Sequence, residues 1–273
     1  MAESTFTERC GVQVIDGYST IAEALKGLAL RDIRVVEINL NNPWFLEQLN
    51  QVGSREEIAS IVKGEGVKWM AHLPEGMGFF DADEGVYQGY LKRQVELQKK
   101  AREAGCRALT AHMGAAPSFA WSGFRRPGVE LFGDWYKKTL HERLQRAGEL
   151  LGNSPYFSFE NVGGFHLEFV RDILDRVEWG AYTMDIGHLK VAHKRIAHSE
   201  FEFYTKHLDD IKVVHVHDND GESDQHLAVT DPDLLKPYLD LAKGSGAFLI
   251  SEVRPLKKAL ESLATLTGIE RNL

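Results

Sequence analysis

The chain has 273 residues, of which 43% are hydrophobic and 26% charged, and its formal net charge at pH 7 is −8. This composition is that of a soluble globular protein, and it excludes a fibrous or disordered chain. The acidic balance also weighs against nucleic acid as a partner, because nucleic-acid-binding proteins usually present a basic face.

The sequence contains no apolar stretch close to the ~18 residues that a membrane span needs, and its start has no basic region followed by an apolar run. We therefore expect a cytoplasmic protein with no membrane contact. The two cysteines, Cys10 and Cys106, are too few for a disulfide framework and lack the paired spacing of a thiolate zinc site. We interpret both as buried thiols.

Eight short runs rich in Val, Ile and aromatic residues recur along the chain and predict β-strands. In chain order they are Gly11–Ile15, Ile33–Asn39, Val67–His72, Arg107–His112, Tyr156–Glu160, Ala181–Asp185, Ile211–His217 and Ala247–Glu252. Longer segments with apolar residues at three- and four-residue spacing follow these runs and predict helices. The helical segments are Thr20–Leu30, Arg55–Lys63, Gly85–Ala104, Asp134–Leu151, Leu167–Val177, Phe201–Leu208, Asp233–Ala242 and Leu256–Thr267.

Strands that alternate with helices are typical of a parallel sheet with crossover helices, and eight such pairs close a barrel. We see no linker, internal domain boundary or low-complexity tract. The sequence therefore predicts an α/β fold with a single (β/α)8 TIM barrel domain over residues 1–273.

A long segment over residues 114–133 follows the fourth predicted strand and is too long for a tight connection. It contains Trp121, Phe124, Arg125 and Arg126. Long loops of this kind in compact barrels are often functional covers. We predict a lid in which the aromatic side chains exclude water and the arginines bind a phosphate or carboxylate of the substrate, with a solvated surface as the alternative for the arginines.

Metal-capable side chains stand at the carboxyl ends of the predicted strands from the second to the eighth. They are Glu37, His72, His112, Glu160, Asp185, His215 with His217, and Glu252. Active sites of such barrels lie at this face. A single strand-end histidine is more often a hydrogen-bonded structural residue than a ligand. Several carboxylates buried side by side, however, are unfavourable unless a cation compensates them, so the whole set predicts a divalent metal site.

Three residues outside the strands extend this set. In Asp185-Ile-Gly-His188 the histidine lies just beyond the strand end, and in Asp224-Gln-His226 the two side chains of an extended segment point the same way. Imidazoles and carboxylates without thiolates favour zinc or manganese over calcium. One metal site is expected, and up to three are compatible with the sequence.

The segments Phe159-Glu160-Asn161-Val162-Gly163-Gly164, Asp185-Ile186-Gly187-His188, His215-Val216-His217-Asp218 and Ser251-Glu252-Val253 resemble the motifs of the xylose isomerase-like barrel superfamily. The resemblance covers nearly the whole chain in strand order. The superfamily includes sugar and sugar-phosphate isomerases and epimerases, inosose-type dehydratases and endonuclease IV.

In the epimerase branch, the resemblance implies one divalent metal held by Glu160, Asp185, His215 and Glu252, with His188 contacting the substrate. In the endonuclease IV branch, it implies three zinc ions on a larger set, all of which is present. That set is His72, His112, Glu160, Asp185, His188, His215, Asp224, His226 and Glu252.

One departure separates this chain from each of the two branches. Glu75 stands where the nuclease branch usually has a tyrosine, and its charge would repel phosphate. The Gly-x-Gly that usually follows the Asp-x-His pair in the sugar branch is replaced by Ala228-Val229-Thr230-Asp231.

Our leading hypothesis is a metal-dependent isomerase or epimerase of a small sugar, sugar phosphate or related polyhydroxy carbonyl compound, acting through a metal-stabilised enediolate. Glu160 and Glu252 would move the proton and His188 would orient a hydroxyl. We expect Glu37 either to orient a ligand or to bind a sugar hydroxyl, and His217 either to support a ligand or to contact substrate. Arg254 is expected to stabilise an oxyanion or carboxylate of the substrate. The alternatives are a zinc phosphodiesterase acting on abasic-site DNA, a metal-dependent dehydratase, and a non-enzymatic polyol or metal sensor. The oligomeric state stays open, with a homo-oligomer among the alternatives.

Overall fold

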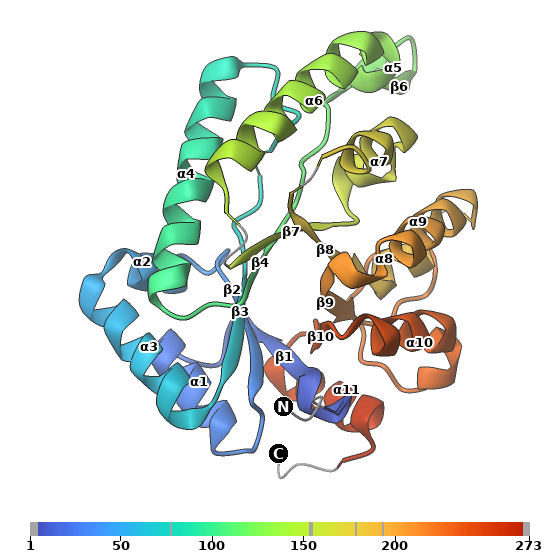
Figure 1. The fold of residues 1–273 in the computed structure, drawn as a ribbon. Helices are drawn as coiled ribbons and strands as arrows, with labels where there is room; N and C mark the ends of the chain where they lie inside the picture. Colours follow the sequence, from blue (N-terminus) through green and yellow to red (C-terminus); the bar gives the residue numbers. More distant parts are fainter. Residues whose placement is uncertain (1–4, 77, 153–154, 178, 193, 270–273) are drawn as a thin grey trace.

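A computed structural model describes residues 5–76, 78–152, 155–177, 179–192 and 194–269. Eight parallel strands close into a barrel in the order β1-β10-β9-β8-β7-β4-β3-β2, with helices around them (Figure 1). The predicted TIM barrel is thereby confirmed. The barrel strands are β1 (Cys10–Val14), β2 (Val35–Asn39), β3 (Lys68–His72), β4 (Ala108–Ala111), β7 (Tyr156–Glu160), β8 (Ala181–Asp185), β9 (Ile211–Val216) and β10 (Phe248–Ser251).

The helices of the described residues surround this barrel. They are α1 (Ile21–Ala29), α2 (Pro43–Asn50), α3 (Val52–Glu65), α4 (Glu84–Glu103), α5 (Gly128–Leu131), α6 (Gly133–Leu150), α7 (Glu168–Leu174), α8 (Ile186–Val191), α9 (Lys194–Lys206), α10 (Lys236–Ser245) and α11 (Leu256–Thr267). Short 3-10 turns occur at Thr7–Arg9, Gly163–His166, Leu208–Asp210 and Pro232–Leu235. None of the helices in these ranges is long and apolar enough to cross a membrane.

Side-chain caps explain where several helices begin. Thr20 accepts a hydrogen bond from the backbone N–H of Glu23 at the start of α1, and Asp83 accepts one from Val86 at the start of α4. Asn42 caps α2, with Pro43 at the first helical position, where its missing N–H costs nothing. These polar residues satisfy backbone donors that the helix itself leaves unpaired.

The largest differences between the helix predictions and the structure are at α2, α8 and α9. We did not predict α2 or α8, because both are shorter than the periodic pattern that reveals a helix. The helix expected at Phe201–Leu208 instead begins at Lys194, and it covers the polar sequence before Phe201 as well. The many charged residues in that stretch obscure the periodic apolar pattern by which a helix is predicted from sequence.

The barrel interior is arranged in layers because alternate residues of each strand point inward. The lower layer is an apolar cluster of Val35, Met70, Ala108, Val213 and Ile250. Two residues further along each of these strands stand Glu37, His72, Thr110, His215 and Glu252. The change from apolar to polar within two residues places the polar groups at the carboxyl ends of the strands.

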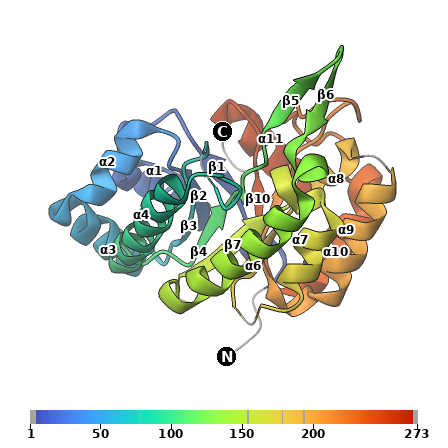
Figure 2. The ribbon, with the colours of Figure 1, turned by 90° about the horizontal axis from the view of Figure 1, so that it is seen from above.

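The segment over residues 114–133 is more ordered than the long loop that we expected. It forms a hairpin of β5 (Ser118–Trp121) and β6 (Phe124–Pro127), followed by α5. Ser122 and Gly123 both have positive φ, at 44° and 93°, as a two-residue hairpin turn requires. Figure 2 shows this hairpin extending away from the body of the barrel.

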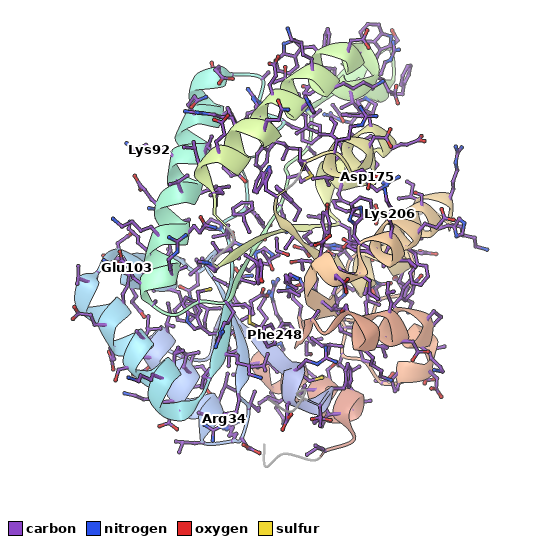
Figure 3. The ribbon with its side chains drawn as sticks, in the orientation of Figure 1. Arg34, Lys92, Glu103, Asp175, Lys206 and Phe248 are labelled. Atoms are coloured by element: carbon purple, nitrogen blue, oxygen red, sulfur yellow. The ribbon has the colours of Figure 1, made fainter. Side chains whose placement is uncertain are left out.

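Ion pairs tie the outer helices together. On the outside of the barrel, Lys206 at the end of α9 lies 2.8 Å from Asp175, which follows α7 (Figure 3). His207 Nε2 lies 2.6 Å from the same carboxylate. The two contacts fix α9 against α7, next to the strands that carry Glu160 and Asp185.

Candidate metal centre

Four ligand-type side chains meet at the carboxyl ends of β7 to β10, and we call them the central cluster: Glu160, Asp185, His215 and Glu252. All four are almost fully buried. His215 Nδ1 lies 2.8 Å from Glu252 Oε2 and 3.3 Å from Glu160 Oε1, while Asp185 Oδ2 is 3.9 Å away. The structure thus brings together the four residues that the epimerase resemblance implies.

A second group, the proximal cluster, consists of His72, Glu75 and His112. The two imidazoles reach the central cluster through Glu160, whose Oε2 lies 3.3 Å from His72 Nε2 and 2.9 Å from His112 Nε2. Glu75 approaches from the open side, with Oε2 3.9 Å from His112 Nδ1. Glu160 therefore faces both clusters with its two oxygens.

We did not predict Glu75 as a candidate ligand. Its Oε1 accepts a hydrogen bond from Asn41 Nδ2, and Asn41 is in turn bound to Asn39 at the end of β2. This chain of amides holds the Glu75 carboxylate beside His112. No spacing rule links Glu75 to His112, so the sequence showed only a charge that would repel phosphate.

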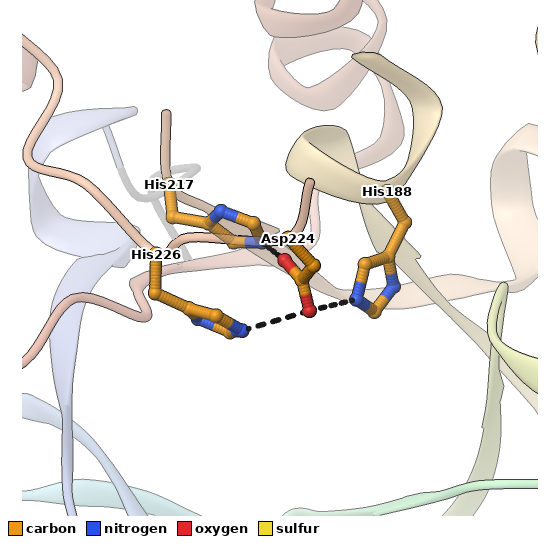
Figure 4. Close-up of side chains that lie close together, drawn as sticks. All are labelled: His188, His217, Asp224 and His226. Atoms are coloured by element: carbon orange, nitrogen blue, oxygen red, sulfur yellow. Dashed lines mark hydrogen bonds and ion pairs between the residues drawn. The ribbon is translucent and has the colours of Figure 1, made fainter. Parts of the chain in front are cut away.

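The third group, the distal cluster, consists of His188, His217, Asp224 and His226 (Figure 4). Asp224 Oδ2 lies 3.3 Å from His188 Nε2 and 3.3 Å from His226 Nε2. His217 Nε2 connects this group with the central one, 3.5 Å from Asp224 Oδ1 and 3.2 Å from Asp185 Oδ1. His188 and His217, for both of which we expected substrate contact, therefore lie among the candidate ligands.

When no cation is bound, attraction between the imidazoles and the carboxylates of these clusters sets their protonation states. Burial opposes the charged forms, but the surrounding carboxylates raise the pKa of His72 to about 9 and that of His188 to about 10. Despite its burial, the Glu160 carboxyl keeps a pKa well below its usual range because His215, His112 and His72 surround it. The neighbouring His215 likewise lowers the pKa of Glu252, against the effect of its burial.

Metal affinity is accordingly expected to rise as the pH is raised from 7 to 9. At pH 7, His72 and His188 carry protons that a cation must displace, since only the neutral imidazole binds metal. Titration calorimetry in buffers of different ionisation enthalpy would show proton release on zinc binding. Binding that is independent of pH in this window, with no proton release, would contradict the expectation.

The donor set fits a divalent cation. Within the described residues, Glu160 Oε2, Asp185 Oδ2, His188 Nδ1 and His217 Nε2 are buried without a hydrogen-bond partner of good geometry. Buried polar atoms are normally satisfied, and orphaned carboxylate oxygens and imidazole nitrogens that face one another are a common signature of a metal site. Nitrogen and oxygen donors without sulfur suit zinc or manganese.

An inner ring of hydrogen bonds supports the ligands from below. Gln13 Nε2 donates to Glu37 Oε2 and to Glu252 Oε1, both at 2.9 Å. Glu37 Oε2 also lies 2.9 Å from His215 Nε2, and Glu37 Oε1 accepts a hydrogen bond from Thr110. Glu37 therefore contacts the back of the His215 ring, a place we had offered only as one alternative to substrate contact.

Gln13 was missed because we took the first strand to carry no site residue. Its inward position in Gly11-Val12-Gln13-Val14, a lone amide between buried valines, is a signal that could have found it. Arg254 Nη2 also contacts Gln13, at 3.1 Å, and Glu252 Oε1, at 3.3 Å. The arginine side chain is 42% exposed, so it borders the open side of the central cluster.

The predicted lid residues lie on the β5–β6 hairpin, with Trp121 and Phe124 exposed next to its turn. Arg125 donates to the backbone oxygen of Ser118, and Arg126 lies over the Trp121 ring at 5.5 Å and beside Glu130 at 3.5 Å. Among the described residues, these contacts stay within the hairpin and α5. Their role toward a substrate remains a prediction.

Comparison with known proteins agrees with this fold. A sequence profile of the xylose isomerase-like TIM barrel family matches residues 28–266. The chain belongs to this family. A match of 27% identity over 111 residues also links it to the uncharacterized protein MJ1614 of Methanocaldococcus jannaschii, spanning 38% of this chain and 42% of that protein.

Solved structures share the family fold at low sequence identity. A D-tagatose 3-epimerase-like protein superposes with a TM-score of 0.74 at 18% identity, covering 95% of this chain and 96% of that one. Endonuclease IV from Thermus thermophilus gives 0.66 at 15% identity, covering 95% and 98%. The TTHB071 protein of the same organism, soaked with ZnCl2, gives 0.65 at 20% identity, covering 97% and 100%. The fold of this family thus carries both sugar epimerases and an endonuclease.

Proposed function

We propose that the protein is a divalent-metal-dependent isomerase or epimerase of a small polyhydroxylated carbonyl compound. The observation that carries the proposal is the placement of Glu160 and Glu252, which reach the same His215 nitrogen from β7 and from the end of β10. Two carboxylates that flank one candidate cation can serve the two faces of a planar substrate. The epimerases that share this fold support the same reaction class.

A cation in the central cluster would supply Lewis-acid polarisation of a carbonyl and its neighbouring hydroxyl, which acidifies the C–H between them. Glu160 would accept that proton on one face, and Glu252, after taking up a proton from solvent, would donate it on the other face, or the reverse. The low pKa of both carboxyls keeps them ionised at neutral pH, as a base requires.

Other residues at the open side would fix the substrate. His188 is only slightly exposed and stands between Glu160 Oε1, at 3.7 Å, and Asp224 Oδ2, at 3.3 Å, so its ring can orient a hydroxyl. Arg254, held against Glu252 and Gln13, is placed to stabilise an oxyanion or a carboxylate. The buried Glu37 acts through His215 rather than by touching the substrate.

The proposal predicts exchange of a substrate C–H with solvent. Protein loaded with manganese or zinc would be incubated in D2O with ketoses, aldoses, their phosphates and keto-polyols, and deuterium at the carbon next to the carbonyl would be followed by NMR. Exchange and a new isomer are expected for at least one compound, and neither is expected after chelation. Full metal loading without exchange across the panel would overturn the proposal.

The contiguity of the three clusters favours a second candidate function, phosphoester hydrolysis by clustered cations. Glu160 is shared by the proximal and central clusters, and Asp185 by the central and distal ones. Neighbouring cations can activate water and stabilise a leaving oxygen. Cleavage of abasic-site duplex or of a simple phosphodiester, without deuterium exchange in sugars, would decide for this alternative and also identify nucleic acid or a phosphodiester as the partner.

A further inference from the structure

Gln13 is an almost fully buried amide in β1, and it uses every hydrogen-bonding position of its side chain. Its Nε2 donates to Glu37 Oε2 and to Glu252 Oε1, both at 2.9 Å. Its Oε1 accepts from Asn39 Nδ2 and from Arg254 Nη2, both at 3.1 Å. A side-chain amide has two N–H groups and two lone pairs on its oxygen, so these four contacts occupy all of them.

These partners favour a single orientation of the amide. A reversed amide would direct its oxygen at two carboxylates and its N–H groups at the donors of Asn39 and Arg254. Buried acceptors that face acceptors, and donors that face donors, stay unsatisfied, which is costly away from water. The Gln13 nitrogen therefore faces Glu37 and Glu252, and it bridges two carboxylates that would otherwise repel each other.

The Glu252 carboxylate is divided between two sides as a result. Its Oε2 lies 2.8 Å from His215 Nδ1 and faces the central cluster. Its Oε1 is held by the Gln13 amide and lies 3.3 Å from Arg254 Nη2, which borders the open side. Because a buried donor holds one of the two oxygens, the orientation of the whole carboxylate follows the Gln13 side chain.

The other proposed proton-transfer carboxylate, Glu160, has no support of this kind. Within the described ranges, the side chains at hydrogen-bond or ion-pair distance from its two oxygens are all imidazoles. These imidazoles belong to the candidate metal clusters themselves. Loss of the Gln13 amide should therefore disturb Glu252 and leave Glu160 in place.

We propose that Gln13 is the positioning residue for proton delivery by Glu252. This inference rests on the function proposed above and specifies its second half. For the epimer whose C–H bond faces Glu160, that carboxylate takes the proton, the electron pair of the bond stays in the enediolate, and the proton passes to solvent. Glu252, carrying a proton from solvent, then donates it to the opposite face as the new C–H bond forms.

Without Gln13, delivery on the second face should fail while exchange on the first face continues. Gln13→Met has a side chain of similar length with no N–H donor, and it would be compared with the wild type in D2O at saturating manganese or zinc. The probe is the compound of the sugar and keto-polyol panel that the wild type exchanges fastest. NMR would measure deuterium in the recovered substrate and in its epimer.

We expect the ratio of epimer to deuterated substrate to fall roughly 10–100-fold in Gln13→Met, with the exchange rate near that of the wild type. The double variant Gln13→Met/Glu252→Gln should lose no more epimer formation than Glu252→Gln alone, because Gln13 acts through Glu252. Glu160→Gln, in contrast, should lose the exchange itself.

Metal binding provides a second readout that does not depend on activity. Gln13 holds Glu252 directly and, through Glu37, the back of His215. Titration of the metal-free full-length protein with cobalt(II) should therefore show a central cation bound about 10–100-fold more weakly in Gln13→Met, the range for residues that support metal ligands.

The matched control is Gln98→Met. Gln98 is also an almost fully buried glutamine, but its Nε2 donates to the backbone oxygens of Gly152 and Pro155. We expect this variant to match the wild type in cobalt affinity and in the ratio of epimer to deuterated substrate. If circular dichroism shows that Gln13→Met does not fold, Gln13→Asn replaces it, since its amide is drawn back by one methylene and should shift both readouts in the same direction.

Two outcomes would overturn the positioning role alone. A Gln13→Met protein that matches Gln98→Met in both readouts would show that the amide only fills space in the barrel. Exchange and epimer formation that fall together at saturating metal would show general support of the centre instead of a role in one proton transfer. A metal-loaded wild type that exchanges no compound would overturn the proposed function and this inference with it, and the failure of the wild type itself distinguishes that result.

Discussion

Replacing Glu160 with glutamine is expected to lower the turnover number by roughly 10²–10⁴-fold, the range associated with a positioned acid or base. The amide has nearly the same size as the carboxylate but no charge and one oxygen fewer. Glu160 lies within 3.3 Å of His72, His112 and His215, so the substitution should also weaken cations on two sides of it. Turnover and metal content per chain, measured by elemental analysis, check both effects.

A suitable control for this substitution is Glu142→Gln. Glu142 is exposed on α6, where it pairs weakly with Lys138 at 3.9 Å. We expect this variant to keep wild-type activity and metal content. A Glu160→Gln protein with full turnover and unchanged metal content would show that Glu160 neither moves the proton nor holds the ions.

Removal of metal should lower the melting temperature substantially. The clusters bury several carboxylates together, and a bound cation stabilises only the folded arrangement of its ligands. One site with free metal at a thousand times its dissociation constant contributes about 4 kcal/mol. In a chain of this size each kcal/mol corresponds to roughly 2 °C or more, so a shift of about 8 °C per site is expected.

Calorimetry of chelated protein, before and after zinc or manganese is restored, measures this shift. The Glu160→Gln variant provides the internal comparison, because its shift should be smaller than that of the wild type. Equal melting temperatures with and without metal would mean that no ion binds the folded state preferentially. Calcium serves as the selectivity control, since imidazole donors suit it poorly.

The barrel and most of its candidate ligands could be predicted because the signals are local. A buried parallel strand has a nearly continuous apolar sequence, so a histidine or a carboxylate at its end stands out, as in Met184-Asp185 or Ser251-Glu252. The strand positions then follow from the alternation with helices. Closure of the barrel places these strand ends together without any further information.

The features of the site that could not be predicted depend on contacts between segments distant in the sequence. Glu75 becomes a candidate ligand only because Asn41, from a different connection, holds its carboxylate beside His112. His217 reaches the distal cluster because the loop after β9 returns, with Asp224 and His226, over the end of its own strand. The hairpin at residues 118–127 has a polar and aromatic sequence whose turn is set by Ser122 and Gly123. No sequence pattern within a single segment indicates such contacts between segments.

The apolar layer formed by Val35, Met70, Ala108, Val213 and Ile250 seals the lower end of the barrel. Above it, side-chain exposure increases outward, from 0% at His215 through 20% at His112 to 46% at Glu75. Solvent therefore reaches the clusters from the side where the strands end. Under the proposed function, product would leave toward the side from which the next substrate arrives, so each turnover would have to clear the centre before another can begin.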